Sequence, residues 1–239
     1  MKINEFKEEL EKLNINYNND ILLKLETYCD FLMEYNSHTN LTAIKTKEDI
    51  YIKHFLDSLF ITKVIDFNNI NNLIDIGTGA GFPGMVIKIF YPNIKLTLLD
   101  SNNKKTTFLN ELSDKLDIND IKIVNDRIEN FAISNLNSFD VVTSRAVAYI
   151  DIITNLGLPL VNKNGKLILM KGSFEEELEF LSKYKNELNV NKFSIEKYHL
   201  PKSNDNRNII VIEKNTIDTK VLSYPQILKN HNKRNSSNK

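Results

Sequence analysis

Apolar residues recur at three- and four-residue steps in the first part of the chain, the spacing that places them on one face of an α-helix. The first such run begins at Ile3, and the second begins at Ile21, just after Asp20, a residue type that favours helix N-caps. A polar loop follows at residues 36–42. The pattern therefore predicts an N-terminal helical cap over residues 1–70. Its helices are expected over residues 3–13, 21–35 and 47–65.

Short apolar runs alternate with helical runs over residues 71–217, an alternation typical of a parallel, doubly wound sheet. The predicted strands cover residues 73–76, 95–100, 121–124, 139–143, 166–170, 192–198 and 208–213. Helices are expected over residues 83–90, 104–116, 150–160 and 174–188. A short polar connection joins the last two strands, so we expect a hairpin at the sheet edge. The predicted fold class is α/β: a Rossmann-like, seven-stranded sheet with helices on both faces and the N-terminal helical cap.

The composition is that of a soluble globular protein, since 41% of the 239 residues are hydrophobic and 26% are charged. No apolar run reaches the ~18 residues that a membrane span needs, and residues 1–10 lack the apolar core of a signal peptide. The four histidines are scattered and Cys29 is the single cysteine. We therefore expect a cytoplasmic protein with no metal site, no disulfide and no membrane partner.

The net charge is zero, but the charges are unevenly distributed. Residues 1–72 contain 8 basic and 12 acidic side chains, residues 73–217 contain 18 of each, and residues 218–239 contain 5 and 1. The last segment thus carries a net charge of +4 (5 − 1). It fits either a solvated chain end or an arm that binds phosphate groups. We treat residues 218–239 as a basic C-terminal tail outside the α/β domain.

A glycine-rich segment at residues 75–84 (DIGTGAGFPG) follows the first predicted strand and opens a helix. Gly77, Gly79 and Gly81 allow the backbone to turn sharply and a ligand to approach closely. Asp100 ends the next predicted strand, where a carboxylate can accept hydrogen bonds from ribose hydroxyls. These features predict a site for a nucleoside-containing cofactor at the carboxyl ends of the strands.

The spacing of the glycines bears on which cofactor binds. The dinucleotide fingerprint G-x-G-x-x-G fails when counted from Gly77, because its third glycine position is Phe82. Counted from Gly79 it succeeds, but that register begins too far beyond the strand for the tight turn. The form G-x-G-x-G from Gly77, preceded by Asp75, resembles motif I of S-adenosylmethionine-dependent methyltransferases. We favour S-adenosylmethionine, with a dinucleotide or a purely structural turn as the alternatives.

Two common methylation chemistries lack their residues in this sequence. Methylation of an exocyclic amine commonly uses an Asn/Asp-Pro-Pro-aromatic motif after the fourth strand, whereas this chain has TSRAVA at residues 143–148. Methylation of pyrimidine C5 needs a thiolate nucleophile. Cys29 lies on an apolar helix outside the sheet domain, where we expect it to pack in the core.

The chain resembles the RsmG (GidB) family of 16S rRNA guanine-N7 methyltransferases over essentially its whole length. The matching segments are residues 40–42, 54–59, 75–84, 99–101, 104–105, 127–129, 144–148, 171–172 and 207–209. The tail departs from the family pattern: Tyr224 and Pro225 are kept, but Gln226 stands where relatives have arginine, and a glycine and a proline are missing beyond it. This departure puts the usual RNA contacts of the tail in doubt.

The resemblance implies S-adenosyl-L-methionine as the cofactor and a guanine in the 530 loop of 16S rRNA, free or within the 30S ribosomal subunit, as the substrate. We expect the enzyme to act as a monomer. The expected cofactor residues, including those of the glycine-rich segment, are Asp75, Gly77, Gly79, Gly81, Phe82, Asp100, Ser101, Ile128, Glu129 and Arg145. The residues expected to contact RNA are Asn40, Lys104, Lys105 and Lys171.

Arg127 and Arg145 are the candidates for catalytic residues, because both follow predicted strands at the carboxyl edge of the sheet. A guanidinium can bind a phosphate or carboxylate through two hydrogen bonds or stack on a base; a structural ion pair is the alternative. His54 and Asp57 lie three residues apart on one predicted helix. We expect them to hydrogen-bond to each other, or to help form a substrate pocket where the cap folds over the cofactor edge.

The chemistry of guanine N7 needs few catalytic groups. N7 carries an in-plane lone pair and no proton, so positioning the two reactants in line is the main requirement. The base must be unpaired or extruded, because the RNA major groove is deep and narrow. Two other functions stay open on the sequence: an NAD-dependent oxidoreductase that uses the Gly79 register, and a non-catalytic module that binds RNA or the ribosome.

Overall fold

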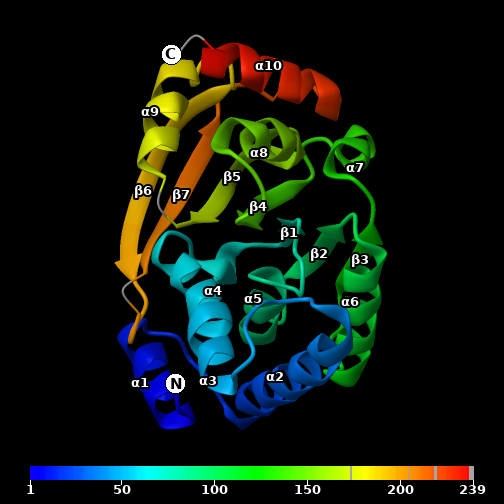
Figure 1. Ribbon diagram of the computed structural model, residues 1–239, viewed down its shortest axis with the longest axis vertical. Helices are drawn as coiled ribbons and strands as arrows, with labels where there is room; N and C mark the ends of the chain where they lie inside the picture. Colours follow the sequence, from blue (N-terminus) through cyan, green and yellow to red (C-terminus); the bar gives the residue numbers. More distant parts are fainter. Residues whose placement is uncertain (173, 204, 218–219, 237–239) are drawn as a thin grey trace.

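The computed structural model describes residues 1–172, 174–203, 205–217 and 220–236; the remaining tail positions, 218–219 and 237–239, lie outside the described residues. A central sheet has helices on both of its faces (Figure 1). Its seven strands follow the order β3-β2-β1-β4-β5-β7-β6. They are β1 (Asn72–Ile76), β2 (Lys95–Asp100), β3 (Ile121–Asn125), β4 (Phe139–Arg145), β5 (Val161–Lys171), β6 (Val190–His199) and β7 (Asn206–Lys214). The predicted fold class and all seven predicted strands are confirmed.

The order of the strands determines where a ligand can bind. β1 pairs in parallel with β2 on one side and with β4 on the other, so the direction of the winding reverses between β1 and β4. In sheets of this kind the crevice for a ligand lies at the carboxyl ends of the strands, at this reversal. β7 is inserted antiparallel between β5 and β6, which confirms the predicted hairpin at the edge.

Helices cover the two faces of the sheet in separate layers (Figure 1). The helices beyond the cap are α5 (Gly84–Phe90), α6 (Asn103–Lys115), α7 (Ile128–Ser134), α8 (Ile150–Gly157), η4 (Leu158–Leu160), α9 (Glu175–Tyr184) and α10 (Tyr224–Ser236). Alternate strand residues point to opposite faces, so Leu73 and Leu98 share a core with α5 and α6, whereas Ile74 and Leu99 share another with α8 and α9.

The N-terminal cap completes the first of these layers. Its elements are α1 (Ile3–Lys12), α2 (Asn19–Thr39), α3 (Lys47–Ile50), the π-helix η1 (Tyr51–Leu56), α4 (Asp57–Leu59) and the 3-10 helices η2 (Phe60–Lys63) and η3 (Phe67–Asn69). Phe6, Tyr28, Cys29 and Phe55 of the cap are buried in the same hydrophobic cluster as Leu98 of the sheet. The cap and the sheet therefore share one core.

Two sequence-based expectations about α2 are wrong. Asn18, not Asp20, is the N-cap: its side chain accepts a hydrogen bond from Ile21 N at 2.9 Å. The helix also continues through the first part of the predicted loop, as far as Thr39. It ends there because Asn40 adopts a φ of +52°, the left-handed conformation that asparagine tolerates at a helix end.

The basic tail forms a helix that the sequence pattern did not predict. α10 lies against α8, where Ile227 is buried with Ile152 and Leu156 (Figure 1). The buried Arg234 donates from Nη1 to Asp151 Oδ2 at 3.1 Å. Between residues 220 and 236, the tail is therefore part of the folded structure and not a solvated end.

Candidate functional site

A cavity of about 520 Å³ lies at the carboxyl ends of β1, β2 and β4, under the loop that precedes α3. Predicted site residues that line it are Gly77, Gly79, Phe82, Asp100, Ser101, Lys105, Arg127, Ile128, Glu129 and Arg145. A second cavity, of about 800 Å³, lies at the amino ends of β1 and β4, where none of the predicted site residues lines it. The first cavity is therefore the candidate site.

The glycine-rich loop forms the floor of this cavity. Gly77 (φ +67°) and Gly79 (φ +62°) both adopt left-handed conformations that favour glycine. A Cβ at Gly77 would come within 2.6 Å of Val147 Cγ2, whereas a Cβ at Gly79 would meet no atom within 4 Å. Gly77 thus lets β1 and the loop after β4 approach closely, and Gly79 leaves space open at the cavity.

The third and fourth glycines of the segment serve protein packing instead. A Cβ at Gly81 would come within 2.7 Å of the Tyr28 hydroxyl, and one at Gly84 within 2.7 Å of Leu98 Cδ2. Neither residue lines the cavity. A dinucleotide counted from Gly79 would need its second glycine, Gly81, beside the pyrophosphate, but Gly81 packs against Tyr28 instead, so the loop does not favour the oxidoreductase interpretation.

Asp75 holds the loop from below rather than lining the cavity. Its Oδ2 accepts hydrogen bonds from Thr78 Oγ1 at 2.7 Å and from Gly84 N at 2.9 Å. The side chain is fully buried, and Oδ1 has no hydrogen-bond partner among the described residues. Burial raises the pKa of Asp75 to about 7, although the two hydrogen bonds oppose the rise. The expected cofactor residue is thus a support of the loop.

Asp100 connects the end of β2 to the same loop. Its Oδ2 accepts from Gly79 N and its Oδ1 from Asn102 N, both at 2.9 Å. Lys105 Nζ lies 3.5 Å from Oδ2. Each carboxylate oxygen can accept a second hydrogen bond, so Asp100 retains the capacity to bind a diol from within the cavity.

Arg145 joins the end of β4 to the cap. Nη1 donates to the Lys53 carbonyl and to Asp57 Oδ2, both at 3.0 Å, and Nη2 donates to His54 Nδ1 at 2.9 Å. Its guanidinium lies 5.2 Å from the centre of the Phe82 ring. His54 and Asp57 therefore bond Arg145 instead of each other, and His54 lines the cavity as the second interpretation expected.

The protonation of His54 follows from these contacts. Burial, followed by the positive charge of Arg145, lowers its pKa to about 3, although the Lys53 carbonyl opposes the change. The ring is thus neutral, and Nδ1 must accept because a guanidinium only donates. The proton lies on Nε2, which donates to Thr42 Oγ1 at 2.9 Å. Phe82 stacks on this ring at 4.2 Å and is nearly fully buried, so it fixes the position of His54.

Asp57 also binds the hairpin of β6 and β7 at the edge of the sheet. Its Oδ1 accepts from the Tyr198 hydroxyl at 2.7 Å, and Arg207 Nε lies 3.7 Å from the same oxygen. Tyr198 belongs to β6 and Arg207 to β7. Asp57 therefore neutralises Arg145 and connects the cap, β4 and the hairpin.

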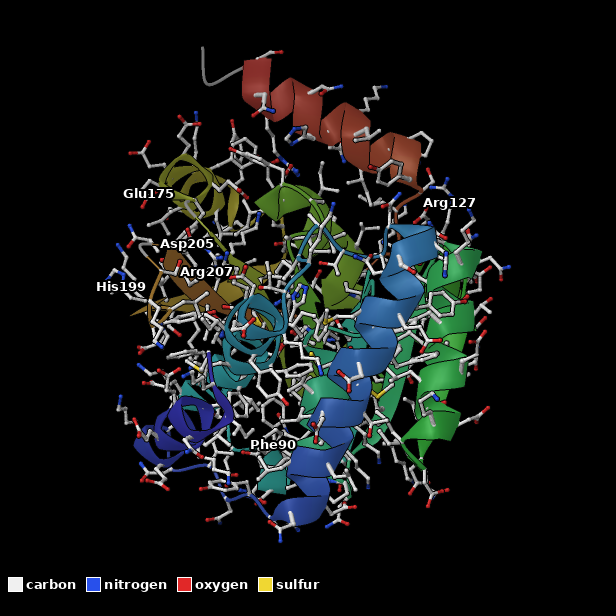
Figure 2. All side chains as sticks on the ribbon, turned by 60° about the horizontal axis from the view of Figure 1, so that its bottom comes forward. Phe90, Arg127, Glu175, His199, Asp205 and Arg207 are labelled. Carbon is white, nitrogen blue, oxygen red and sulfur yellow. The ribbon has the colours of Figure 1, made fainter. Side chains whose placement is uncertain are left out.

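Arg127 differs from Arg145 in its exposure. It lines the cavity, but 65% of its side chain is exposed and its nearest carboxylate, Glu129 Oε1, is 3.9 Å away. Figure 2 shows it on the side of the molecule opposite Arg207 and Asp205, which lie beside each other. Arg127 is thus at the rim of the cavity, whereas Arg145 is inside it.

The residues expected to contact RNA have different surroundings. Lys104 and Asn40 are exposed but do not line the cavity, and Lys105 lines it. Only 11% of the Lys171 side chain is exposed, because Nζ donates to Glu177 Oε2 at 2.6 Å and to the Ala148 carbonyl at 2.9 Å. Lys171 is committed to an internal ion pair that fixes the loop after β4.

Sequence reasoning missed several lining residues, among them Thr42, Thr78, Val147 and Tyr224. Thr42 and Tyr224 lay in segments that match the RsmG pattern or its tail, and that match was the available signal. Val147 was in such a segment too, but only the fold shows that it packs over Gly77.

Comparison with known proteins decides the family. Residues 21–210 match the GidB model, described as rRNA small subunit methyltransferase G. The chain belongs to this family. It is 41% identical over 217 residues to the ribosomal RNA small subunit methyltransferase G of Bacillus licheniformis, covering 90% of this chain and 91% of that one. It is 39% identical over 229 residues to the Bacillus subtilis protein of the same name, covering 95% of each.

A solved structure supports the fold independently. Precorrin-6y C5,15-methyltransferase from Geobacter metallireducens aligns with a TM-score of 0.52 at 14% identity, over 72% of this chain and 90% of that one. At this identity the likeness concerns the fold alone. No helix within the described ranges has the length and apolar character for crossing a bilayer. Nor do the described His, Cys, Asp and Glu residues form a group of three that could hold a metal ion.

Proposed function

We propose that this protein transfers the methyl group of S-adenosyl-L-methionine to N7 of a guanine in the 530 loop of 16S rRNA. The observation that carries the proposal is one cavity lined both by Asp100 with the glycine-rich loop and by Thr42 and His54 of the cap. The first part suits a nucleoside cofactor, and the second suits an acceptor base beside it. Membership of the rRNA small subunit methyltransferase G family supports this pairing.

The residues of the first part fit the cofactor. Asp100 can accept the ribose hydroxyls, Gly79 leaves open space above the loop, and the half-buried Ile128 presents an apolar surface for the adenine ring. When bound, the cofactor would supply a methyl group activated by its positively charged sulfur. The protein then has to hold the acceptor atom in line with that group.

The charges of the second part suit the product. Methylation makes the guanine cationic, and a net positive pocket would oppose it. Arg145 is neutralised by Asp57 at 3.0 Å, and His54 is neutral. The aromatic face of Phe82 lies beside both. No described group is needed as a general base, because N7 has no proton to lose. Arg145 is therefore a positioning residue in this proposal, not an acid or a base.

The proposed substrate surface lies around the cavity. In this proposal, Arg127 at the rim and the exposed Lys104 in the first turn of α6 would meet RNA phosphates. Action as a monomer is part of this proposal. A 30S-type ribosomal particle as the substrate, and the cytoplasm as the location, belong to the same proposal.

The test is transfer of label from methyl-labelled S-adenosylmethionine to 16S rRNA in 30S subunits from a strain that lacks the modification. We expect label at N7 of one guanine in the 530 loop, located by nuclease mapping. Binding of S-adenosylhomocysteine without any transfer would point to the non-catalytic module. Stabilisation by NAD instead of S-adenosylhomocysteine would favour the oxidoreductase.

A further inference from the structure

Thr42 is held rigidly at the cavity by the cap. Its backbone N–H donates to Asn36 Oδ1, and Asn36 Nδ2 donates to the Thr42 carbonyl, both at 2.9 Å. Thr42 lines the cavity together with His54, Phe82 and Arg145. These two hydrogen bonds hold the backbone of Thr42 in place at the cavity.

The Thr42 hydroxyl acts as an acceptor in its hydrogen bonds to the protein, which leaves its O–H group as a donor. Oγ1 accepts from His54 Nε2 at 2.9 Å and from Ile44 N at 3.1 Å. The first bond has this direction because Arg145 donates to His54 Nδ1, which places the ring proton on Nε2. A hydroxyl has two acceptor lone pairs and one O–H donor. Both lone pairs of Thr42 are thus used, and its hydroxyl hydrogen has no other hydrogen bond to the described residues.

A methyltransferase that acts on N7 of guanine has to reject adenine. Both purines have N7, and they differ at the neighbouring position 6, where guanine has an oxygen acceptor and adenine an amino donor. An arginine fork on O6 and N7, the commonest way to recognise guanine, would cover the atom that must be methylated. Arg145 has three of its hydrogen bonds committed to the cap as well. A single fixed donor beside N7 solves this problem.

We propose that the Thr42 hydroxyl donates a hydrogen bond to O6 of the acceptor guanine and so selects guanine over adenine. The inference rests on the proposed function. Arg145 and His54 act through Thr42: Arg145 fixes the tautomer of His54, whose Nε2–H occupies one lone pair of the hydroxyl, and Ile44 N occupies the other. Only a base with an acceptor at position 6 is therefore accommodated. An adenine amino group would place a donor against this donor.

The experiment uses 30S subunits reconstituted with three bases at the target position. Guanine has N7 and O6, 2-aminopurine has N7 but lacks O6, and hypoxanthine has N7 and O6 but lacks the 2-amino group. We compare kcat/KM of the wild type with Thr42→Val, which removes the hydroxyl, and Thr42→Ser, which keeps it. Thr62→Val is the matched control, because Thr62 is a cap threonine outside the cavity whose hydroxyl donates to the Leu59 carbonyl.

We expect Thr42→Val to lower kcat/KM with guanine and hypoxanthine about tenfold more than with 2-aminopurine, as loss of one hydrogen bond to O6 requires. The loss with 2-aminopurine measures the support that the hydroxyl gives to His54 and Ile44 N. Thr42→Ser keeps the hydroxyl and should keep the wild-type ratio of kcat/KM between guanine and 2-aminopurine, and Thr62→Val should behave as the wild type. An equal loss with all three bases would mean that Thr42 only supports His54, and would overturn the inference.

The wild type alone provides a second test that depends on no variant. It should methylate 2-aminopurine about tenfold less efficiently than guanine, whereas equal rates would also overturn the inference. Failure of the proposed function has a different signature: the wild type would transfer no methyl group to guanine, although binding of S-adenosylhomocysteine persists.

Discussion

Arg145 and Asp57 form an ion pair at 3.0 Å across 88 residues of sequence, and this contact joins the helical cap to the carboxyl edge of the sheet. Both side chains are largely buried, and Asp57 also accepts a hydrogen bond from Tyr198 of the edge hairpin. A single carboxylate thus holds together the cap, β4 and the edge hairpin beside the candidate site.

Replacing Asp57 by alanine should therefore be strongly destabilising. The guanidinium of Arg145 and the hydroxyl of Tyr198 would both lose their buried acceptor. Removing one partner of a buried pair costs about 3–5 kcal/mol. Urea unfolding measures the loss, with Glu196→Ala as the control, because its pair with Lys63 is exposed and is expected to contribute less than about 1 kcal/mol. Equal losses in the two variants would contradict the role assigned to Asp57.

Gly77→Val should abolish binding of S-adenosylhomocysteine in a titration. The substitution places a branched side chain at φ +67°, where the Cβ alone would come within 2.6 Å of Val147 Cγ2. A Cβ at Gly79 meets no protein atom, so Gly79→Ala should cost folding only the conformational strain of about 1–2 kcal/mol, whereas its methyl group would enter the proposed cofactor space. Gly77→Ala combined with Val147→Ala separates the two causes, because it relieves the clash but keeps the strained φ. Unchanged affinity in Gly77→Val would refute the role of the loop.

The pH dependence of stability should reveal Asp75. Burial raises its pKa from 3.8 to about 7 in the folded state, so between these values the folded protein holds a proton that the unfolded chain has lost. Stability contributed by this group is full below about pH 4 and is lost as the pH rises towards 7. Asp75→Asn removes the titration.

The difference in unfolding free energy between the wild type and Asp75→Asn should thus fall from pH 4 to pH 7 and stay constant above. The comparison also cancels the opposite contribution of His54, whose lowered pKa costs stability as the pH falls from 6.5 towards 3. A difference that does not change with pH would show that Asp75 is ionised in the folded protein.

Arg127→Ala and Lys171→Ala should separate RNA contact from structural support. Arg127 is exposed at the rim, so its loss should weaken RNA binding and reduce the slope of log Kd against log salt by about 0.7–0.9. Lys171 is engaged with Glu177 and the Ala148 carbonyl, so its loss should lower the melting temperature and leave the salt slope unchanged. A reduced slope for Lys171→Ala would restore it as an RNA contact.

The strands and the glycine loop could be predicted because their signals are local. An apolar run that ends in DIGTGAG specifies both β1 and a turn that only glycine allows, whatever the rest of the chain does. Asp100 ends β2, and neighbouring parallel strands end at the same edge of a sheet. The sequence could therefore predict that Asp100 lies beside the glycine loop.

The contacts between distant segments could not be predicted in this way. The spacing of His54 and Asp57 indicates a shared helix face, but their bonds to Arg145 depend on where the cap lies and on the π-helical turn of η1. The sequence does not show that Lys171 has a partner, because Glu177 lies beside it only once α9 is folded. A π-helix has no sequence signature comparable to a cap or a glycine turn, and such turns are frequent at functional sites.

The last prediction concerns the C-terminal helix α10, whose positive charge suggested a solvated end or a phosphate-binding arm. Asp151 is fully buried; Arg234 neutralises it at 3.1 Å, and His231 Nδ1 lies 2.8 Å from its other oxygen, so these side chains of the tail bind the protein's own interior. Tyr224, the first residue of α10, lines the cavity. Arg234→Ala should therefore cost about 3–5 kcal/mol of unfolding free energy, by leaving Asp151 without its guanidinium. It should also weaken S-adenosylhomocysteine binding, because a loosened α10 no longer holds Tyr224 at the cavity.

Lys229→Ala is the control on the exposed face of the same helix and should change neither quantity. If Arg234→Ala changes RNA affinity while stability and cofactor affinity stay at the wild-type values, the tail is an RNA-binding arm after all.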